Sequence, residues 1–310
     1  MKIILTGGSG FIGSNLVKYL NLNKISNIII IDYFDNEKKL KNLINLKFRE
    51  LISPERFLKD YSKSSEKFDA FIHNGAISNT QISDKKYMNY HNLFLSKNYF
   101  EYAKKNCDKF IYASSASVYG NEKKGKTNPL NVYANSKLLF DKFILNQIKK
   151  GGRFNIIGLR YFNVYGPNEH HKKGMCSPIQ TFFDDAKSKK KITLFGSSHG
   201  LKKGEHKRDF IDVNDVSKIC YKIVKSKKKI RSNIFDVGSG YQLSFNQIAK
   251  IFLKYFKNCK LTYKPFPKKL LKHYQYNTEI NDYKIFKLLR FKPNKPEHGI
   301  KNYITYLKNK

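Results

Sequence analysis

The first 32 residues constrain the fold of this chain more than any other segment. A short apolar run at 3–5 is followed by the cluster GGSGFIG at 7–13, an amphipathic helical pattern, and the apolar run Ile28–Ile31, which ends at Asp32. This order of strand, glycine-rich turn, helix, strand and acidic residue is typical of a dinucleotide-binding βαβ unit. We therefore expect a parallel α/β sheet with a nucleotide site at its first turn.

The glycines of this cluster have separate physical roles. Gly7 and Gly8 permit a tight turn, because glycine tolerates backbone conformations that other residues rarely adopt. Gly10 lets backbone N–H groups approach a pyrophosphate, and Gly13 lets the helix pack closely on the sheet. Asp32 lies where a carboxylate accepts a hydrogen bond from a ribose hydroxyl.

Size and composition indicate a globular intracellular protein. The 310 residues, 40% of them hydrophobic, can bury a substantial core as one large domain or two coupled ones. We find neither the ~20 consecutive apolar residues of a spanning helix nor the apolar region of a secretory signal. The four cysteines are widely spaced and form no CxxC pair, which favours reduced thiols and a cytoplasmic location.

The formal net charge of +36 is the unusual feature of the composition. The lysines are spread over the whole chain, and no nucleic-acid-binding motif accompanies them. We interpret them as solvated groups that reflect a genome rich in A and T codons, and we expect no nucleic-acid or membrane partner. The positive field should still attract an anionic substrate.

Strand-like and helical patterns alternate over the first half of the chain. Beyond the first unit, apolar runs lie at 68–73, 110–114 and 154–161, and helical patterns lie near 54–63, 85–105 and 133–150. Strands separated by helices imply a Rossmann-type, doubly wound parallel sheet that is covered on both faces. Ligands in such sheets bind at the carboxyl ends of the strands.

The alternation loosens beyond residue 163. A helix is expected at 179–189, a short run at 192–195, and further strands at 209–213 and 233–237. We expect a cofactor-binding domain formed by residues 1–163 and about 208–237. Residues 164–207 and 238–310 should then form a smaller, discontinuous substrate-binding lobe.

Tyr133, Lys137 and Ser115 form the candidate catalytic set. Tyr133 and Lys137 share one helical face at a spacing of i and i+4. A tyrosine of pKa ~10 is a poor base at neutral pH, so a nearby ammonium and an oxidised nicotinamide would have to favour the phenolate. Lowering its pKa by about three units requires that the phenolate be stabilised over the phenol by roughly 4 kcal/mol. Ser115, at a strand end, can share a hydrogen bond with the same substrate oxygen. A surface Tyr–Lys pair is the alternative interpretation, since YxxxK is common by chance.

These motifs together resemble the extended short-chain dehydrogenase/reductase family, over essentially the whole chain. The resemblance is carried by TGGSGFIG at 6–13, SSASVYG at 114–120, YANSK at 133–137 and RYFNVYGP at 160–167. Longer segments are similar to the ADP-L-glycero-D-manno-heptose 6-epimerase subgroup: KYMNYHN at 86–92, PLNVYANSKLLFD at 129–141, RYFNVYGPNEHHK at 160–172, KRDFIDVNDV at 207–216 and PFPKKLLKHYQ at 265–275.

The resemblance implies an isomerase that inverts C6″ of an ADP-heptose by transient oxidation and re-reduction with tightly bound NADP, for lipopolysaccharide core precursor synthesis. Such a reaction needs a proton-transfer group on each side of C6″. Tyr133 matches one, and Lys172 matches the other, with Lys173 as a register alternative. His170 and His171 are adjacent and face different directions, so no metal site is expected. The resemblance also implies a homo-oligomer.

The same resemblance implies two sets of binding residues. The cofactor set is Gly7, Gly10, Phe11, Ile12, Gly13, Asp32, Tyr33, Lys39, Asn74, Gly75, Ala76, Ile77, Ser78, Asn92, Lys137, Val164 and Lys172. The substrate set is Ser115, Asn163, Phe195, Gly196, Ser197, Ser198, Arg208 and Tyr274. The planar fork of Arg208 suits a diphosphate, although a salt bridge to Asp209 is an alternative, and Tyr274 could instead be a buried lobe residue.

The residues expected beside the cofactor ribose differ in part from those of the subgroup. Asp32 ordinarily favours NAD, because a carboxylate repels a 2′-phosphate. Lys39 matches a lysine that neutralises this phosphate in the subgroup, whereas a second lysine is replaced by Pro54. We therefore expect NADP, with NAD as the alternative.

The substrate end also departs from the pattern. A glutamate of the subgroup is Asn74 here, and a serine and a histidine that contact substrate are replaced by Gly174 and Thr181. These differences leave the exact sugar open.

Three other functions are alternatives. A UDP-sugar 4-epimerase shares Ser115, Tyr133 and Lys137, and Lys172 is the residue that separates it from a two-base 6-epimerase. A dehydratase needs an adjacent acid pair where this chain has Ser115-Ala116-Ser117. A non-catalytic protein that binds a dinucleotide or a polyanion would not require the Ser115–Tyr133–Lys137 set.

Overall fold

The computed structural model describes residues 1–310 except 62, 123–124, 173 and 228–229. Its largest element is a seven-stranded sheet in the order β10-β6-β5-β4-β1-β2-β3, in which all neighbouring strands are parallel. The strands are β1 (Ile3–Thr6), β2 (Ile28–Ile31), β3 (Glu50–Ile52), β4 (Ala70–His73), β5 (Lys109–Ser115), β6 (Asn155–Tyr161) and β10 (Asn233–Val237). The order reverses next to β1, which creates a topological switch point. The predicted doubly wound sheet is confirmed.

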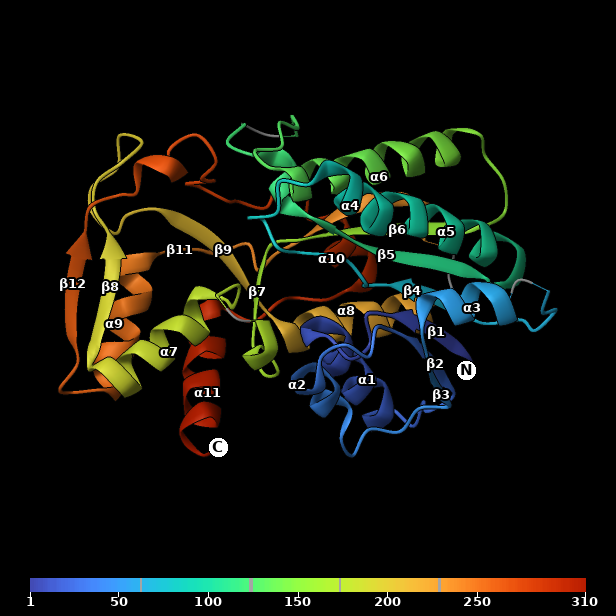
Figure 1. Cartoon of the computed structure of the whole chain (residues 1–310), viewed down its shortest axis with the longest axis horizontal. Coiled ribbons are helices and arrows are strands. Elements are labelled where there is room, and N and C mark those ends of the chain that lie inside the picture. The colour runs from blue at the N-terminus through green and yellow to red at the C-terminus, as the bar shows by residue number, and fades with distance from the viewer. Residues whose placement is uncertain (62, 123–124, 173, 228–229) are drawn as a thin grey trace.

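Helices cover both faces of this sheet (Figure 1). One face carries α3 (Pro54–Asp60), α4 (Lys85–Asn89), α5 (Leu95–Asn106) and α6 (Val132–Lys149), and the other carries α1 (Phe11–Leu22), α2 (Glu37–Leu40), η1 (Lys41–Leu43), α8 (Val213–Lys225) and α10 (Lys284–Leu289). Alternate strand residues enter opposite cores: Ile3 and Leu5 pack with α1 and α8, whereas Ile4 packs with α3, α5 and α6. Near-continuous apolar strands are thus buried on both sides, as expected for a covered parallel sheet.

The helix predicted at 85–105 is interrupted. Between α4 and α5, the five residues Tyr90–Phe94 (η2) form a π-helical segment. Such a segment adds a residue to the turn and frequently lies at functional sites. The helical pattern alone gives no signal for it.

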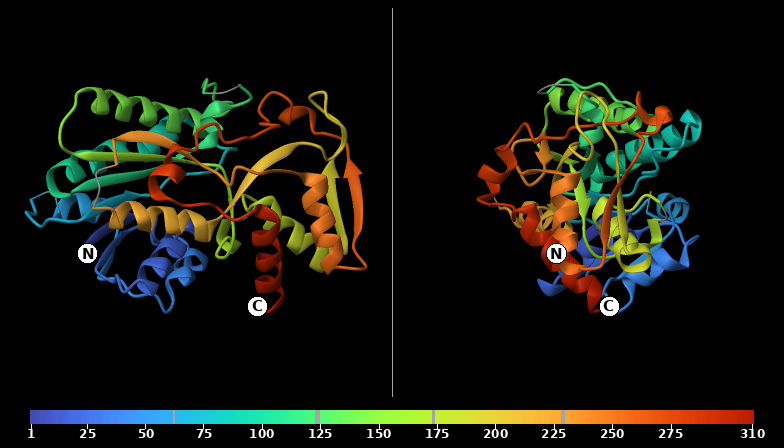
Figure 2. Two further views of the ribbon diagram at one scale, coloured as in Figure 1. Left: turned by 180° about the vertical axis from the view of Figure 1, so that it is seen from behind. Right: turned by 90° about the vertical axis from the view of Figure 1, so that its left-hand side faces the viewer.

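The rest of the chain builds two small sheets. β7 (Asn163–Tyr165), β9 (Lys207–Asp212) and β11 (Gln242–Ser244) form one, and β8 (Lys191–Phe195) and β12 (Lys260–Lys264) form the other. A third core cluster joins them to α7 (Pro178–Lys189), α9 (Phe245–Tyr255) and α11 (Pro296–Lys308). The short segments η3 (Ala116–Tyr119), η4 (His170–Lys172) and η5 (Lys268–Leu270) complete the fold. The β8–β12 pair forms one extremity of the molecule, far from the N-terminus (Figures 1 and 2).

The strand expected at 209–213 is β9, which pairs with β7 and β11 rather than with the large sheet. The strand at 233–237 is β10, at the edge of the large sheet. The domain boundaries drawn from the sequence stay a prediction. No helix among the described residues is long and apolar enough to cross a membrane.

A single lysine joins the large sheet to the end of α8. The Nζ atom of Lys109, at the start of β5, donates to the carbonyl oxygens of Ile223, Val224 and Ser226 at 3.1, 2.8 and 2.9 Å. The last carbonyls of a helix have no intrahelical partners, and a cation there also meets the negative end of the helix dipole. Lys109 therefore caps α8.

Replacing Lys109 by Met should lower the free energy of unfolding by about 1–3 kcal/mol, because three carbonyls lose a charged donor. Urea denaturation followed by circular dichroism measures the change. Lys250→Met is the control, because Lys250 is exposed on α9 and its replacement should stay within about 0.5 kcal/mol. Equal losses in both variants would contradict the capping role.

Candidate active site

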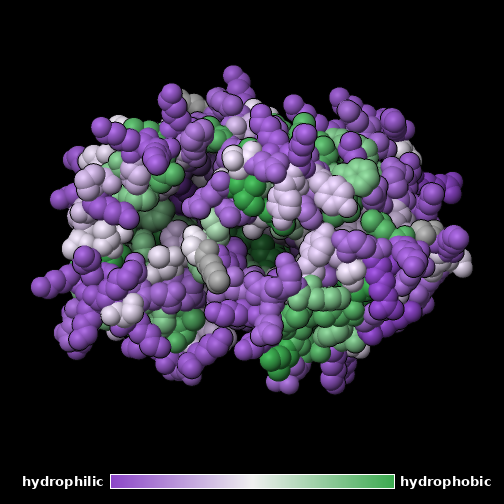
Figure 3. Space-filling view, viewed as in Figure 1, coloured by the Kyte–Doolittle hydropathy of each residue, from purple (hydrophilic) through white to green (hydrophobic). Residues whose placement is uncertain are grey.

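A cleft of about 690 Å³ opens at the carboxyl ends of β1, β4 and β5. The space-filling view shows a hollow near the middle of this face of the molecule (Figure 3). The cleft brings together most of the predicted residues, namely Gly7, Gly10, Phe11, Ile12, Gly13, Asp32, Tyr33, Lys39, Asn74, Gly75, Ala76, Ile77, Ser78, Ser115, Tyr133, Lys137, Asn163, Val164 and Lys172.

The glycine-rich turn forms one wall of the cleft. Gly7 has a φ of +69°, and a Cβ on Gly13 would lie 2.1 Å from the carbonyl oxygen of Gly7. Only glycine allows the helix and the turn to approach this closely. Helix α1 begins without a side-chain cap, and its first residues, Phe11 and Ile12, line the cleft. Its free N–H groups fit a pyrophosphate.

A second wall also carries polar atoms without a partner. Both amide atoms of Asn74 and the hydroxyl of Ser114 are buried at the cleft and form no hydrogen bond among the described residues. A buried polar atom without a partner costs free energy, so such atoms indicate a ligand or water. Together with the uncapped end of α1, these residues fit a bound dinucleotide.

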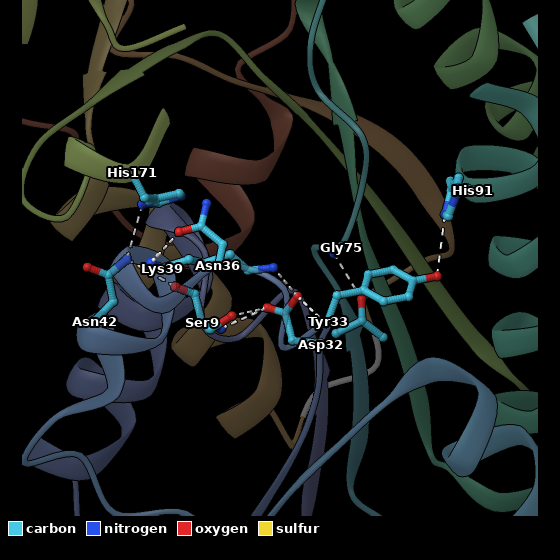
Figure 4. Close-up of polar contacts among 10 residues, drawn as sticks. Ser9, Asp32, Tyr33, Asn36, Lys39, Asn42, Gly75, His91 and His171 are labelled. Carbon is cyan, nitrogen blue, oxygen red and sulfur yellow. Dashed lines mark hydrogen bonds and ion pairs between the residues drawn. The ribbon is translucent and has the colours of Figure 1, made fainter. Parts of the chain in front are cut away.

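The Asp32 carboxylate is already engaged by donors of the chain (Figure 4). It accepts hydrogen bonds from Ser9 N at 3.0 Å, Ser9 Oγ at 2.5 Å and Tyr33 N at 2.9 Å. The Lys39 Nζ atom lies 2.6 Å from the Asp32 Oδ1 atom. The expected ribose contact would therefore be made by an ion pair, and not by an isolated carboxylate. The sequence pattern did not indicate the part played by Ser9.

Asn92 lies behind the cleft rather than in its lining. It is buried in the π-helical segment, where its Oδ1 atom accepts from Ile77 N at 2.8 Å and its Nδ2 atom donates to Ile77 O at 2.9 Å and Ser136 Oγ at 3.1 Å. These bonds fix the loop that contains Ile77 against the helix of Tyr133. Asn92 therefore acts on the cleft through Ile77.

Tyr133 and Lys137 lie in the first turns of α6, which Asn131 caps by accepting from Ala134 N. Lys137 is 4% exposed, and its Nζ atom donates to the Ala113 carbonyl at 2.8 Å. Burial raises the pKa of Tyr133, and a hydrogen bond with Ser115 acts in the opposite direction. The expectation that Lys137 and an oxidised nicotinamide together favour the phenolate stays a prediction.

An acidic residue that the sequence analysis missed favours the charged form of Lys137. Burial lowers the pKa of Lys137 to about 8, and the Asp141 carboxylate acts to raise it. Asp141 is completely buried and accepts from Tyr112 Oη at 2.8 Å and Arg160 Nε at 2.9 Å. The signal was present, because Asp141 follows Lys137 by four residues on the same helical face.

Lys172 lines the cleft from a segment that follows β7. It lies in η4, with its Nζ atom 5.4 Å from the centre of the Phe11 ring. The loop folds around Glu169, a carboxylate that is 1% exposed and accepts from Gly166 N at 3.1 Å and Ser177 Oγ at 2.7 Å. The register alternative, Lys173, lies outside the described residues.

A second group of predicted residues gathers outside this cleft, around a buried cation. Arg208 is 7% exposed, and its guanidinium lies 5.0 Å from the Tyr274 ring centre. The salt bridge to Asp209 is not formed, because that carboxylate accepts from Ser239 and Gly240 instead. Burial lowers the pKa of Arg208, and no carboxylate among the described residues pairs with it. A buried guanidinium without an acid suits an anionic ligand.

Aromatic rings surround this cation. Phe195 lies against Tyr274, with ring centres 6.2 Å apart, and Ser198 bonds to His206 at 2.8 Å and to His199 at 2.9 Å. Gly196 and Ser197 connect these two contacts. The two histidines and the neighbouring Phe266 were not predicted, because isolated aromatic residues in a loop carry no pattern.

Comparisons with known proteins agree with this geometry. The model of the NAD dependent epimerase/dehydratase family matches residues 3–238. An ADP-L-glycero-D-manno-heptose-6-epimerase from Brachyspira hyodysenteriae is 40% identical over 290 residues, covering 90% of this chain and 89% of the relative. The crystal structure of the Helicobacter pylori ADP-L-glycero-D-manno-heptose-6-epimerase has a TM-score of 0.84 at 31% identity, covering 99% and 96% of the two chains.

A UDP-glucuronic acid 4-epimerase variant from Bacillus cereus, in complex with a fluorinated UDP-sugar and NAD, has a TM-score of 0.83 at 25% identity, covering 100% and 99%. The chain belongs to the NAD-dependent epimerase/dehydratase family. The resemblance to the ADP-heptose 6-epimerase subgroup drawn from the sequence is confirmed.

Proposed function

We propose that this chain is a cytoplasmic, NADP-dependent isomerase that converts ADP-D-glycero-D-manno-heptose into ADP-L-glycero-D-manno-heptose, for lipopolysaccharide core precursor synthesis. The observation that carries this function is the meeting of Tyr133 and Lys172 in one cleft with the glycine-rich turn. The two residues come from different lobes, as two proton-transfer groups on opposite sides of one carbon would require. The names of the Brachyspira and Helicobacter relatives support the choice of sugar.

Inversion at C6″ requires that its hydrogen leave one face and return to the other. The nicotinamide, when bound, supplies a hydride acceptor and donor for this carbon. Tyr133 takes the hydroxyl proton at its phenolic oxygen on one side of C6″, while Ser115 bonds to the same substrate oxygen. Lys137, fixed by Ala113 and Asp141, provides the positive charge that stabilises the ionised phenol.

The second half of the reaction uses the opposite lobe. The sugar presents its other face, and Lys172 then gives a proton to the oxygen of C6″. Proton exchange with solvent returns Tyr133 and Lys172 to their starting forms. The substrate diphosphate suits Arg208, whose guanidinium is buried without an acidic partner, and the adenine suits the aromatic rings around Tyr274. The substrate would therefore span from the small lobe to the cleft.

The direct test incubates the purified protein with ADP-D-glycero-D-manno-heptose and follows C6″ stereochemistry by NMR, while a denatured sample identifies the released nucleotide. We expect epimerisation without added cofactor, and release of NADP. Conversion of a UDP-sugar at C4″ in place of the heptose would favour the 4-epimerase. DNA binding at micromolar affinity in physiological salt, without turnover, would favour the polyanion-binding alternative.

Tyr133→Phe and Lys172→Met test the two proton-transfer groups. Each should lower kcat by about 10²–10⁴-fold, because general acid–base catalysis contributes factors of this size. Steady-state rates on the ADP-heptose measure the effect, and Lys250→Met should retain full activity. Parental activity in Tyr133→Phe would refute the catalytic set. Parental activity in Lys172→Met alone would refute the two-base arrangement and leave a single-tyrosine mechanism.

The pKa of Lys137 predicts the alkaline limit of activity. As the pH rises through about 8, Lys137 loses its proton and no longer stabilises the phenolate, so kcat should fall. Asp141→Asn removes a charge that raises the pKa of Lys137, so the fall should begin about one pH unit lower. The measurement is the pH profile of kcat below the melting temperature of the variant. Asp185→Asn, which removes a partly exposed carboxylate of α7 that pairs with Lys189, is the control and should leave the alkaline limit unchanged. An unmoved alkaline limit in Asp141→Asn would contradict the role of Asp141.

A further inference from the structure

The segment that carries Lys172 is a loop whose two ends are bonded to one carboxylate. The loop begins at Gly166, directly after β7, and ends at Ser177, which caps α7 by accepting from Gln180 N. The Glu169 carboxylate accepts from Gly166 N at 3.1 Å, and from Ser177 N and Oγ at 2.5 and 2.7 Å. Compact loops whose ends lie close together frequently carry function. The carboxylate of Glu169 therefore closes this loop.

Glu169 also bonds to Lys172 directly. The carbonyl oxygen of Glu169 accepts from Lys172 N at 2.9 Å and from Cys176 Sγ at 3.3 Å. Both acceptor groups of one residue are thus used within the loop, the carboxylate at the two ends and the carbonyl at Lys172. A displacement of Glu169 would move the backbone of Lys172 with it.

The closing carboxylate is buried, and no salt bridge to it is formed among the described residues. Burial raises the pKa of Glu169, while its hydrogen bonds and the positive charge of Lys172 act to lower it. Two other titratable groups face it, Cys176 and Tyr303, and both are neutral because burial raises the pKa of each. Within the described part of the chain, Lys172 is therefore the cation on which this buried charge acts.

A buried carboxylate costs free energy, so its place in this loop calls for a physical reason. The start of α7 does not require it, because Ser177 caps the helix with its own hydroxyl. The carboxylate adds a fixed separation between the end of β7 and the start of α7, and an attraction for the ammonium group that lies between them. We propose that Glu169 is a positioning residue, which holds Lys172 at the cleft for the second proton transfer. This inference rests on the role that the proposed function gives to Lys172.

A positioning role of this kind affects one half-reaction and spares the other. In the proposed mechanism, one epimer of the sugar loses its hydroxyl proton to Tyr133. The other epimer loses its proton to Lys172, because the second half-reaction also runs in reverse. A loop that no longer places Lys172 correctly slows the oxidation of this second epimer alone. Loss of a merely structural contact would instead slow both oxidations together.

The test measures the two oxidations separately. Holoenzyme with oxidised cofactor is mixed with either ADP-heptose epimer, and the initial rate at which reduced nicotinamide appears is followed by stopped-flow absorbance. Glu169→Gln removes the charge and turns an NH₂ group toward a donor of the loop, whereas Glu169→Asp keeps the charge on a shorter side chain. Asp184→Asn is the matched control, because Asp184 is exposed on α7 and its carboxylate accepts from the Gln180 side chain at 2.8 Å.

Lys172→Met identifies the epimer whose oxidation depends on Lys172. For that epimer we expect Glu169→Gln to be slower than wild type by about 10²-fold, the cost of a misplacement of about 1 Å, and Glu169→Asp to be slower by a smaller factor. The other epimer should react within about twofold of wild type in both variants, as should both epimers in Asp184→Asn. Glu169→Gln should cause no further loss beyond about twofold when it is added to Lys172→Met, because the two residues act as one unit.

Equal slowing of both epimers in Glu169→Gln, or slowing of neither, would overturn the inference, as would a further loss when Glu169→Gln is added to Lys172→Met. If Glu169→Gln does not fold, Glu169→Asp decides: slowing of the Lys172-dependent epimer alone supports the role, and equal effects on both epimers overturn it. The proposed function itself fails, and the inference with it, if wild type oxidises neither epimer or if Lys172→Met oxidises both at the wild-type rate. Failure of the inference alone leaves the difference between the epimers in Lys172→Met intact.

Discussion

The molecule must keep one ammonium ion charged where almost no water reaches it, and much of the structure follows from that requirement. Lys137 donates to a backbone carbonyl, and the charge of Asp141, which bonds to Arg160, favours its protonated form. Arg160 donates to the Tyr119 hydroxyl at 2.8 Å, and Tyr119 donates to Asp236 at 2.5 Å. This chain of charges joins β5, β6, α6 and β10. A buried charge is tolerated only when it is paired, so the network fixes the strands that surround the catalytic helix.

Short hydrogen-bonded links connect the cleft with the elements around Arg208. Asn163, the first residue of β7, accepts from Thr278 at 3.1 Å, and Thr278 also accepts from the backbone of Asp209 at 3.0 Å. The buried Arg208 is thus connected to the cleft by three hydrogen-bonding residues. A substrate with a charged diphosphate and a neutral sugar has matching environments at the two ends of this path. The same contacts explain why the predicted substrate residues divide into two neighbouring groups.

Most of the large sheet could be predicted from the sequence, because its strands are apolar runs bounded by helical patterns. The glycine cluster, Tyr133 and Lys137 were also accessible, since their spacing has a physical meaning. Short strands such as Asn163–Tyr165 were missed, because three residues carry no periodicity. The donors around Asp32 and the contact between Asn42 and His171 join segments that are distant in the sequence, so no local pattern records them. The ionisation of Tyr133 could not be predicted either, because burial and hydrogen bonding act on it in opposite directions.

The turn that carries Lys172 is tied to the nucleotide end of the cleft at several points. Asn15 donates to the Pro167 carbonyl at 2.9 Å, and Asn168 donates to Ser14 at 3.0 Å, so the turn is fastened to the first helix. Any movement that opened this end would also carry Lys172 away from the reaction centre. In the proposed mechanism, loss of the dinucleotide contacts would therefore also displace the group that completes the second half-reaction. Retention of the dinucleotide and completion of the reaction are coupled through this one turn.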